Sequence, residues 1–302
     1  MTSPTGRFAP TPSGALHFGS LIAALASFCD ARAQHGRWLL RIEDVDTPRV
    51  VAGASDQILR DLEAFGFTWD GPVLYQSDHF EHYRHYLDLL LRQGLCYACQ
   101  CSRRSLREQG VSSGPLGQIY PGLCRDLKLD TANRTIRLST ATAGETGFRD
   151  RVYGDFSLDL TRCVGDFVLR RNDGVYAYHL AVVVDDQLQG VNQVVRGADL
   201  LENTCLHLYL QQCLGFDQPQ YMHLPLINNV DGVKLSKQTG AQPLDHRQPS
   251  RLLLAALRHL GQQPPDELEG DNPATVLDWA CHHWNPGLIP VQRALAAQDH
   301  DR

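Results

Sequence analysis

Residues 6–20 read GRFAPTPSGALHFGS, and this stretch decides how the N-terminal part of the chain folds. It begins with a short extended run and continues with two prolines and a glycine at 10–14, which exclude regular structure. Apolar residues then recur at helical spacing over 21–29, and Gly36 ends the helix. Because a second strand follows at 38–42, the order strand, helix, strand predicts a right-handed parallel crossover.

Such a crossover is typical of an open α/β sheet, in which ligands bind at the carboxyl ends of the strands. The loop 10–19 follows the first predicted strand, and the acids within 43–46 follow the second. We therefore predict an α/β fold with a doubly wound, Rossmann-type parallel sheet. The ligand site is expected where this loop and these acids meet.

The rest of the chain continues the mixture of helices and strands, apart from one irregular stretch. Residues 96–124 are rich in cysteine, arginine and glycine. The stretch is too short to form an apolar core of its own, and a bound metal would supply the stability that such a core provides elsewhere. The C-terminal part carries short helices separated by prolines. Periodicity and turn residues predict helices at 55–65, at 79–93 with Ser77 as its cap, and at 200–214, and strands at 135–138, 167–171, 175–184, 191–195 and 221–226.

Composition narrows the class of protein. With 302 residues, of which 43% are hydrophobic, the chain can bury a substantial core. No apolar run approaches the ~18 residues of a membrane span, and no secretory signal is present, so we expect a cytoplasmic protein. Nine cysteines in such a chain indicate reduced thiols or a metal site. The net charge of −6 argues against a protein that coats nucleic acid over its whole surface, although it permits a local basic face.

Two loops far apart in the sequence suit a polyphosphate. His17, Gly19 and Ser20 stand at the entry to the first helix, where unpaired backbone amides and the helix dipole favour anions. The second loop reads Lys234-Leu235-Ser236-Lys237 and follows the last predicted strand. Either loop alone is an ordinary polar turn. Together they provide the two positive clamps that phosphoryl chemistry on ATP needs.

These two loops resemble the two signatures of the class I aminoacyl-tRNA synthetases. Further stretches resemble the glutamyl branch of that family, namely residues 6–14, 41–46, 176–186 and 195–199, so that the resemblance runs in order from about residue 6 to 241. This chain departs from the family at Ser20, where a second histidine is common, and at Thr11, where many relatives have serine. The first departure puts a second phosphate contact in doubt, whereas the second keeps the hydroxyl.

The resemblance implies roles for individual residues. Glutamate presents two carboxylates, which Arg7 and Arg196 can hold bidentately, and an ammonium group, for which Glu43 is the natural partner. Tyr178 can add a hydroxyl contact. The implied sets are His17, Gly19 and Lys237 for catalysis; Arg7, Ala9, Thr11, Glu43, Tyr178 and Arg196 for glutamate; and His17, Gly19, Ser20, Lys234, Ser236 and Lys237 for ATP with Mg²⁺.

The chain ends soon after the lysine loop, whereas a full glutamyl-tRNA synthetase continues into a large anticodon-binding region. The resemblance is therefore closest to the truncated paralogues, which attach glutamate to the queuosine base of tRNA(Asp) and activate glutamate without tRNA. One alternative is a minimal glutamyl-tRNA synthetase that loads the acceptor end. Another is a non-catalytic, zinc-dependent RNA-binding protein whose basic face is made of Arg103, Arg104, Arg107 and Arg125.

The cysteine-rich segment leaves the metal ligands open. Spacing alone favours four thiolates, in which Cys96 and Cys99 form a Cys-x-x-Cys pair, because sulfur is the better ligand for Zn²⁺. The family resemblance instead implies Cys99, Cys101, Tyr120 and Cys124, and we follow it. The alternative without a metal is a set of buried free thiols.

We expect four regions and a monomer. The first half of the nucleotide-binding catalytic domain is expected at 1–94 and a zinc-binding insertion at 95–130. The second half of the catalytic domain, with the lysine loop, follows at 131–240, and a short helical C-terminal region without an anticodon-binding domain occupies 241–302. The expected partners are L-glutamate and tRNA(Asp) carrying queuosine, and no membrane.

Overall fold

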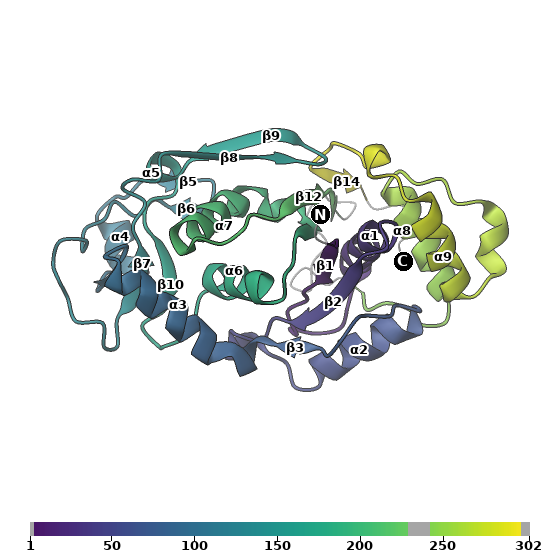
Figure 1. Ribbon diagram of the computed structural model, residues 1–302, viewed down its shortest axis with the longest axis horizontal. Coiled ribbons are helices and arrows are strands. Elements are labelled where there is room, and N and C mark those ends of the chain that lie inside the picture. The colour runs from purple at the N-terminus through teal and green to yellow at the C-terminus, as the bar shows by residue number, and fades with distance from the viewer. Residues whose placement is uncertain (1–2, 229–241, 297–302) are drawn as a thin grey trace.

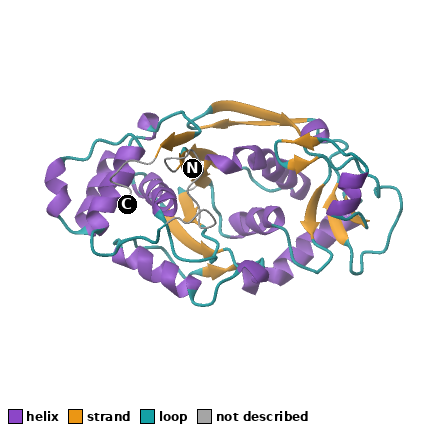
Figure 2. Ribbon diagram, turned by 180° about the vertical axis from the view of Figure 1, so that it is seen from behind, coloured by secondary structure: helices purple, strands orange, loops and turns teal. Residues whose placement is uncertain are grey.

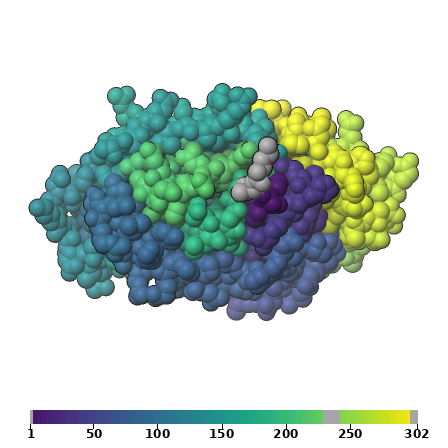
Figure 3. Space-filling model, viewed as in Figure 1, coloured from purple at the N-terminus to yellow at the C-terminus, as the bar shows by residue number. Residues whose placement is uncertain are grey.

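The computed structural model describes residues 3–228 and 242–296. The molecule is elongated, with the cysteine-rich part of the chain at one end and the C-terminal helices at the other (Figure 1). In the space-filling view the same two ends stand out as the teal and yellow parts of the surface (Figure 3). The parallel strands that carry the predicted ligand site lie between these ends (Figure 1).

Two sets of parallel strands form the centre of the fold. The first set has the order β1-β2-β3, and in the second β11 pairs in parallel with β12. β11 and β1 are tied together at their starts, because the Thr5 N–H donates to Asn192 Oδ1 at 2.8 Å and the Asn192 N–H donates to the Thr5 carbonyl at 3.1 Å. The strands are β1 (Thr5–Phe8), β2 (Arg37–Ile42), β3 (Leu74–Tyr75), β11 (Gln193–Gly197) and β12 (Gln220–Leu224).

Helix α1 (Phe18–Arg32) follows β1 and is buried along most of its length. It shares one apolar core with α8 (Pro249–His259) and α9 (Pro273–His283), which lie beside it in Figure 1. A helix that is apolar on all sides is stable only when neighbouring elements bury it, as the sheet and these two helices do here. The parallel pair β1–β2 with α1 between them confirms the predicted crossover unit, and the C-terminal helices hold α1 and the loop before it in position.

A second apolar core lies toward the cysteine-rich end. It packs three helices, α3 (Phe80–Arg92), α6 (Tyr178–Leu188) and α7 (Leu201–Leu214), against an antiparallel sheet. That sheet has the order β10-β7-β4. Its strands are β4 (Cys96–Cys99), β7 (Thr135–Leu138) and β10 (Phe167–Arg170).

The remaining elements border these two cores. The hairpin of β8 (Glu145–Asp150) and β9 (Gly154–Asp159) runs along one long edge of the molecule (Figure 2) and joins β12 through one parallel bridge, between Tyr221 and Asp150. No described helix is long and apolar enough to cross a membrane. The short elements are α2 (Ala54–Ala64), α4 (Arg103–Glu108), α5 (Leu160–Cys163), β5 (Ser113–Gly114), β6 (Gly117–Gln118), β13 (Leu226–Asn228) and β14 (Ala294–Ala296).

Two local predictions are wrong. The run 175–184 was expected to be a strand, but Tyr178–Leu188 is the helix α6. Residues 180–186 are all buried, so the run lacks the alternation that separates a strand from a buried helix. Ser77 does not cap α3, since its hydroxyl donates to the Asp44 carboxylate at 2.7 Å and the helix begins at Phe80 after a 3₁₀ turn.

Candidate active site

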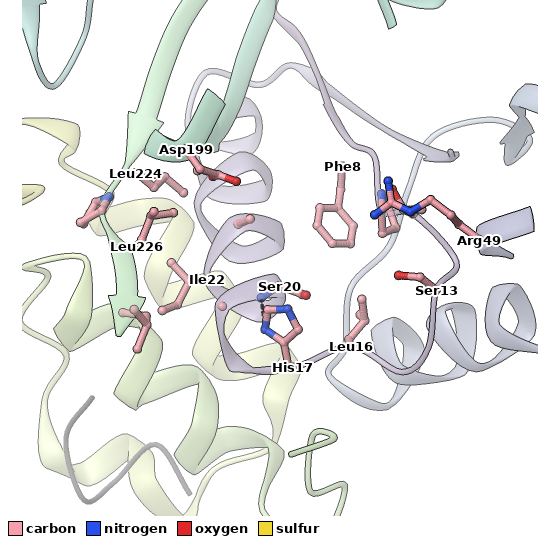
Figure 4. Close-up of a pocket in the computed structure, with 17 residues that line it drawn as sticks. Phe8, Ser13, Leu16, His17, Ser20, Ile22, Arg49, Asp199, Leu224 and Leu226 are labelled. Carbon is pink, nitrogen blue, oxygen red and sulfur yellow. Dashed lines mark hydrogen bonds between the residues drawn. The ribbon is translucent and has the colours of Figure 1, made fainter. Parts of the chain in front are cut away.

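A cavity of about 550 Å³ opens at the carboxyl ends of β1, β11 and β12. Figure 4 shows His17 and Ser20 at the start of α1 on its wall, with Asp199, Leu224 and Leu226 on the opposite side. Such a place is where ligands bind in open parallel sheets. The lining residues are Phe8, Pro10, Thr11, Ser13, Leu16, His17, Gly19, Ser20, Ile22, Ala23, Arg49, Gly197, Asp199, Leu224, Pro225, Leu226 and Ile227.

His17 is the N-cap of α1. Its Nδ1 accepts a hydrogen bond from the Ser20 N–H at 3.3 Å, which satisfies one of the unpaired amides of the first turn. Because Nδ1 is the acceptor, the proton of the neutral ring is on Nε2. The cap therefore fixes the tautomer in which Nε2 is the donor.

Gly19 keeps the imidazole of His17 in place. A Cβ at this position would lie 3.1 and 3.2 Å from Cε1 and Nδ1 of His17, closer than nearly all contacts of real side chains. A glycine at the entry to a helix lets a ligand approach the backbone closely. The structure adds a second reason, since a side chain at position 19 would displace the His17 ring.

The lysine loop cannot be placed, since Lys234, Ser236 and Lys237 lie outside the described residues. Both described ends of that segment lie against the cavity. Leu226 and Ile227 line it, and the Leu244 N–H donates to the Leu16 carbonyl at 3.1 Å, directly before His17.

Arg7 lies on β1 and is only 3% exposed. Its Nε donates to Asp186 Oδ1 at 3.1 Å, and the same oxygen accepts from Arg41 Nη1 at 2.8 Å. Burial works to raise the pKa of Asp186, but the charges of Arg7 and Arg41 outweigh it and hold the pKa below its ordinary value. Asp186, on α6, thus fixes the orientation of Arg7 from behind.

Glu43 directly follows β2, beside this pair. Its side chain is buried, and its Oε1 lies 3.4 Å from Arg41 Nη2. Burial raises the pKa of Glu43, although Arg41 and Arg7 act against the shift. Glu43 is therefore a buried carboxylate whose ion pair with Arg41 is long. It is suited to bind the ammonium group of a ligand.

Arg196 and Tyr178 complete the group. Arg196 Nη1 donates to the Tyr178 hydroxyl at 3.3 Å. Burial raises the pKa of Tyr178, and the charge of Arg196 acts against the shift. Arg7 Nη1 donates to the carbonyl of Val195, directly before Arg196. Arg41 links the Asp186 that Arg7 binds to Glu43, so the four side chains belong to one neighbourhood. The structure thus brings together Arg7, Glu43, Tyr178 and Arg196. Thr11 lines the neighbouring cavity, and Ala9 directly follows β1.

Three of the predicted metal ligands form a cluster. The sulfur atoms of Cys99, Cys101 and Cys124 all lie within 4.8 Å of one another, with 3.6 Å between those of Cys101 and Cys124. The Tyr120 hydroxyl lies 3.2 Å from Cys99 Sγ and 3.6 Å from Cys101 Sγ. Tetrahedral Zn²⁺ with bonds of about 2.3 Å to sulfur would hold its ligand atoms about 3.7 Å apart. The donor set therefore fits Zn²⁺.

Cys96 does not belong to this cluster. It stands three residues before Cys99 on β4, so the two side chains point to opposite faces of the strand. Cys96 packs in the core of the antiparallel sheet, where burial raises the pKa of its thiol and Cys213 is a neighbour. The arrangement with four thiolates, which spacing favoured, is therefore excluded by strand geometry.

Two of the four arginines in the basic face of the RNA-binding alternative form ion pairs. Arg125 binds the buried Asp166 with two nitrogens, at 2.8 and 3.2 Å from Oδ2, and Arg104 pairs with Glu108. A third arginine of that face, Arg103, lines a polar cavity of about 580 Å³ next to the cysteine cluster, together with Arg134, Arg137 and Arg171.

Sequence reasoning missed several residues that support the site. Asp186 was part of the motif 176–186, but nothing in the sequence links it to Arg7, 179 positions earlier. No role was predicted for His207, His223 or Asp150. His207 on α7 and His223 on β12 contact Arg196, and Asp150 on β8 contacts His223. Only the pairing of Arg196 with His223 across two neighbouring strands could have indicated this.

The comparisons with known proteins agree with this geometry. Residues 5–269 match the family model "tRNA synthetases class I (E and Q), catalytic domain". The chain is 53% identical over 285 residues to a glutamyl-Q tRNA(Asp) synthetase of Pseudomonas fluorescens, with 94% of this chain and 93% of the relative covered. A protein of the same name from Ectopseudomonas mendocina is 54% identical, with 98% of each chain covered.

Among solved structures, the glutamate-tRNA synthetase of Elizabethkingia anophelis is similar with a TM-score of 0.81 and 25% identity. The match covers 99% of this chain and 69% of that one. A putative arginyl-tRNA synthetase of Campylobacter jejuni is similar in fold, with a TM-score of 0.51 and 13% identity. The α/β catalytic fold with its parallel sheet is therefore confirmed.

Proposed function

Since the chain belongs to the class I tRNA synthetases for glutamate and glutamine and is an aminoacyl-tRNA synthetase-like ligase, we propose that it activates glutamate with ATP and transfers it to the queuosine base of tRNA(Asp). The relatives named glutamyl-Q tRNA(Asp) synthetase match over nearly their whole length, which supports this function over charging of the acceptor end. Glutamate, ATP with Mg²⁺ and tRNA(Asp) are the partners that follow, and the protein acts as a monomer.

The observation that carries the proposal is the meeting of two sites at one edge of the sheet. Arg7, Glu43, Tyr178 and Arg196 offer two cations, an anion and a hydroxyl, which match the two carboxylates and the ammonium group of glutamate. The cavity beside them begins at the N-terminus of α1, where a triphosphate finds backbone amides and His17. Thr11 lines this cavity, and Ala9 directly follows β1.

In the first step, an oxygen of the glutamate α-carboxylate attacks the α-phosphorus of ATP. The bond from that phosphorus to the bridging oxygen breaks, pyrophosphate leaves, and glutamyl adenylate forms. His17 donates from Nε2 to the developing charge, and Lys237 together with Lys234 and Ser236 acts on the phosphates from the other loop. Mg²⁺ supplies further neutralisation of the phosphate charge when it is bound.

In the second step, a hydroxyl of the queuosine ring attacks the acyl carbon of the adenylate. The hydroxyl loses its proton, a glutamyl ester forms, and AMP leaves. We assign no general base among the described residues to this transfer. The adenylate phosphate is released as an anion, and the same positive groups that stabilised it in the first step stabilise it again.

We further propose that the segment around 95–130 is a zinc-bearing insertion. Cys99, Cys101, Tyr120 and Cys124 would hold Zn²⁺, which would fix the ends of a segment that has a small core of its own. No residue of this cluster lines the cavity at α1. The metal would therefore stabilise the fold of this segment and take no part in the reaction.

The experiment that tests the function measures exchange of pyrophosphate into ATP with glutamate and without tRNA. We expect exchange by the folded protein, and we expect Lys237→Ala to reduce its rate about 10²-fold or more. Arg60→Ala, on the exposed side of α2, is the matched control and should exchange at the rate of the wild type. Absence of exchange by the wild type would contradict the proposal.

Transfer is tested with labelled glutamate and tRNA(Asp) that carries queuosine. Nuclease digestion should place the label on the anticodon fragment. Label on the terminal adenosine would instead identify an enzyme that charges the acceptor end.

A further inference from the structure

The Arg196 guanidinium is surrounded by neutral hydrogen-bond acceptors. Its Nε donates to His223 Nε2 at 3.2 Å, its Nη1 to His207 Nδ1 at 3.2 Å, and its Nη2 to the Thr204 hydroxyl at 2.8 Å. The Tyr178 hydroxyl and the Leu200 carbonyl accept at 3.3 and 3.4 Å. These five acceptors match the five N–H groups of an arginine, and none of them carries a charge in this arrangement.

The surroundings of Arg7 and Arg41 are different. Those two arginines share the Asp186 carboxylate, so part of their charge is compensated inside the protein. Among the residues that the structure describes, no carboxylate lies within ion-pair distance of Arg196, although the side chain is only 6% exposed. A buried cation without an internal counter-charge is costly, and an anionic ligand removes that cost.

Hydrogen bonds fix the state of both histidines. His223 Nδ1 lies 2.7 Å from Asp150 Oδ2, so it carries the proton and leaves Nε2 to accept from Arg196. His207 accepts from Arg196 at Nδ1, so its Nε2 holds the proton and donates to His179 Nδ1 at 3.1 Å. Each ring therefore has one required tautomer.

A proton on either acceptor nitrogen would remove its hydrogen bond to Arg196 and add a like charge beside it. Burial lowers the pKa of His207 far below its ordinary value, and Arg196 and the neighbouring His179 add to the shift. Burial also lowers the pKa of His223, and the hydrogen bond to Asp150 offsets this only in part. Both rings are therefore neutral at pH 7.

We propose that His207 and His223 are positioning residues, which hold the Arg196 guanidinium in a fixed plane as neutral acceptors and so preserve its full charge for a substrate carboxylate. Asp150 contributes indirectly, because it sets the tautomer of His223 and does not contact Arg196. The proposal rests on the proposed function, in which glutamate supplies the carboxylate.

The geometry also assigns a place to Tyr178. Its hydroxyl oxygen accepts from Arg196, so its own proton is available to donate to an oxygen of the ligand. A carboxylate at this point would meet the Tyr178 hydroxyl and the charge of Arg196 together. Two-nitrogen binding by Arg196 would require the ligand to replace the longest contacts, those to Tyr178 and Leu200.

The test compares His207→Asn with His207→Asp. Both variants put an oxygen near the place of Nδ1, and both leave the same space where the ring was, but only aspartate brings a charge. We expect KM for glutamate in pyrophosphate exchange to be at least tenfold higher in the aspartate variant than in the asparagine variant. KM for ATP should be the same in both.

The opposite result overturns the proposal. If His207 only supplied a hydrogen bond, aspartate would serve as well as asparagine or better, because its bond to arginine is the stronger one. Equal KM values for glutamate, or a lower value for the aspartate variant, would show this. His283→Asp, on the exposed side of α9, controls for the added negative charge and should behave as the wild type.

A second pair of variants, at His223, tests the proposal if the substitutions at His207 prevent folding. His223→Gln and His223→Glu both offer an oxygen in the place of Nε2, and the same ratio of KM values is expected. If the wild type exchanges no pyrophosphate, the proposed function fails. Calorimetric titration of the four variants with glutamate then decides the proposal alone, since weaker binding by the charged member of each pair supports it and equal or tighter binding refutes it.

Discussion

At the scale of single residues, His17 has two roles that a substitution can separate. Its Nδ1 caps α1, and its Nε2 carries the proton that the proposed mechanism uses. His17→Asn keeps a side-chain oxygen for the Ser20 N–H but offers no donor at the position of Nε2. We expect the melting temperature to fall by no more than a few degrees, whereas the rate of pyrophosphate exchange should fall about 10²-fold.

His17→Ala is the companion variant, because it removes both roles. It should lose the activity and in addition about 1 kcal/mol of stability, measured by urea denaturation. Equal stability of the two variants would show that the cap contributes nothing. Full activity of His17→Asn would exclude Nε2 as a donor to the phosphates.

The residues of the proposed site were predictable from the sequence only because several motifs occur together and in order. Arg7, Glu43, Tyr178 and Arg196 were named from the resemblance, and the structure brings them together. Their supports were not predictable. Asp186, His207 and His223 act through contacts between elements that are far apart in the chain. The local sequence around a single histidine in an apolar helix does not indicate which arginine it will contact.

At the scale of elements, the most reliable predictions were those with a clear period or a clear stop. The strand at 135–138 and the helix at 200–214 were predicted nearly to their ends, because alternation in the first and the Gly215 stop of the second are local signals. The run 175–184 failed for the opposite reason. It becomes α6, buried between α3 and α7, and only tertiary packing distinguishes such a helix from a buried strand.

The cysteine-rich segment gives a prediction at this scale. With Tyr120 as the fourth ligand, Tyr120→Phe should bind Zn²⁺ at least tenfold more weakly than the wild type, whereas Cys96→Ser should bind it equally well. Metal content after dialysis against a graded series of chelator concentrations measures this. Equal retention of Zn²⁺ by Tyr120→Phe and the wild type would remove the tyrosine from the ligand set, and loss of Zn²⁺ from Cys96→Ser would contradict the strand geometry.

Zn²⁺ should also stabilise the insertion more than the catalytic centre. Its small core has only four buried side chains, those of Cys99, Leu106, Tyr120 and Cys124, with a few half-buried ones packed against it. Removal of the metal should therefore expose the segment 100–134 to proteolysis first. Cleavage that begins in α1 instead would show that the two parts of the fold are not separate in stability.

At the scale of the whole molecule, the buried histidines make stability depend on pH. The pKa of His179 is lowered to about 4, by burial and by the charge of Arg196, and the pKa values of His207 and His223 are lowered as well. In the unfolded chain each of these rings titrates near its ordinary value of about 6.5. Below that pH the unfolded chain takes up protons that the native state does not bind, so the free energy of unfolding falls.

The size of the effect follows from the same linkage. A histidine that is neutral in the native state and charged in the unfolded chain contributes about 1.4 kcal/mol per pH unit. The loss begins as the pH drops through about 6.5 and continues until the native rings themselves take up protons, at about 4 for His179. Glu43 acts in the opposite direction, since burial raises its pKa and the native state then binds the proton more readily.

Urea denaturation at pH 6.5, 5.5 and 5.0 measures this slope, and His207→Asn isolates one ring. The variant should lose less stability over this interval than the wild type, by about 1 to 2 kcal/mol, because one of the rings that must stay neutral is gone. The exposed His282→Asn is the control and should keep the slope of the wild type. Since the native rings stay neutral over this interval, the charge of Arg196 stays uncompensated, and protonation of His207 should not change KM for glutamate between pH 6.5 and 5.0. An identical slope in His207→Asn and the wild type would mean that His207 takes up a proton as readily in the native state as in the unfolded chain. The ring would then not be the neutral acceptor that the proposal about Arg196 requires.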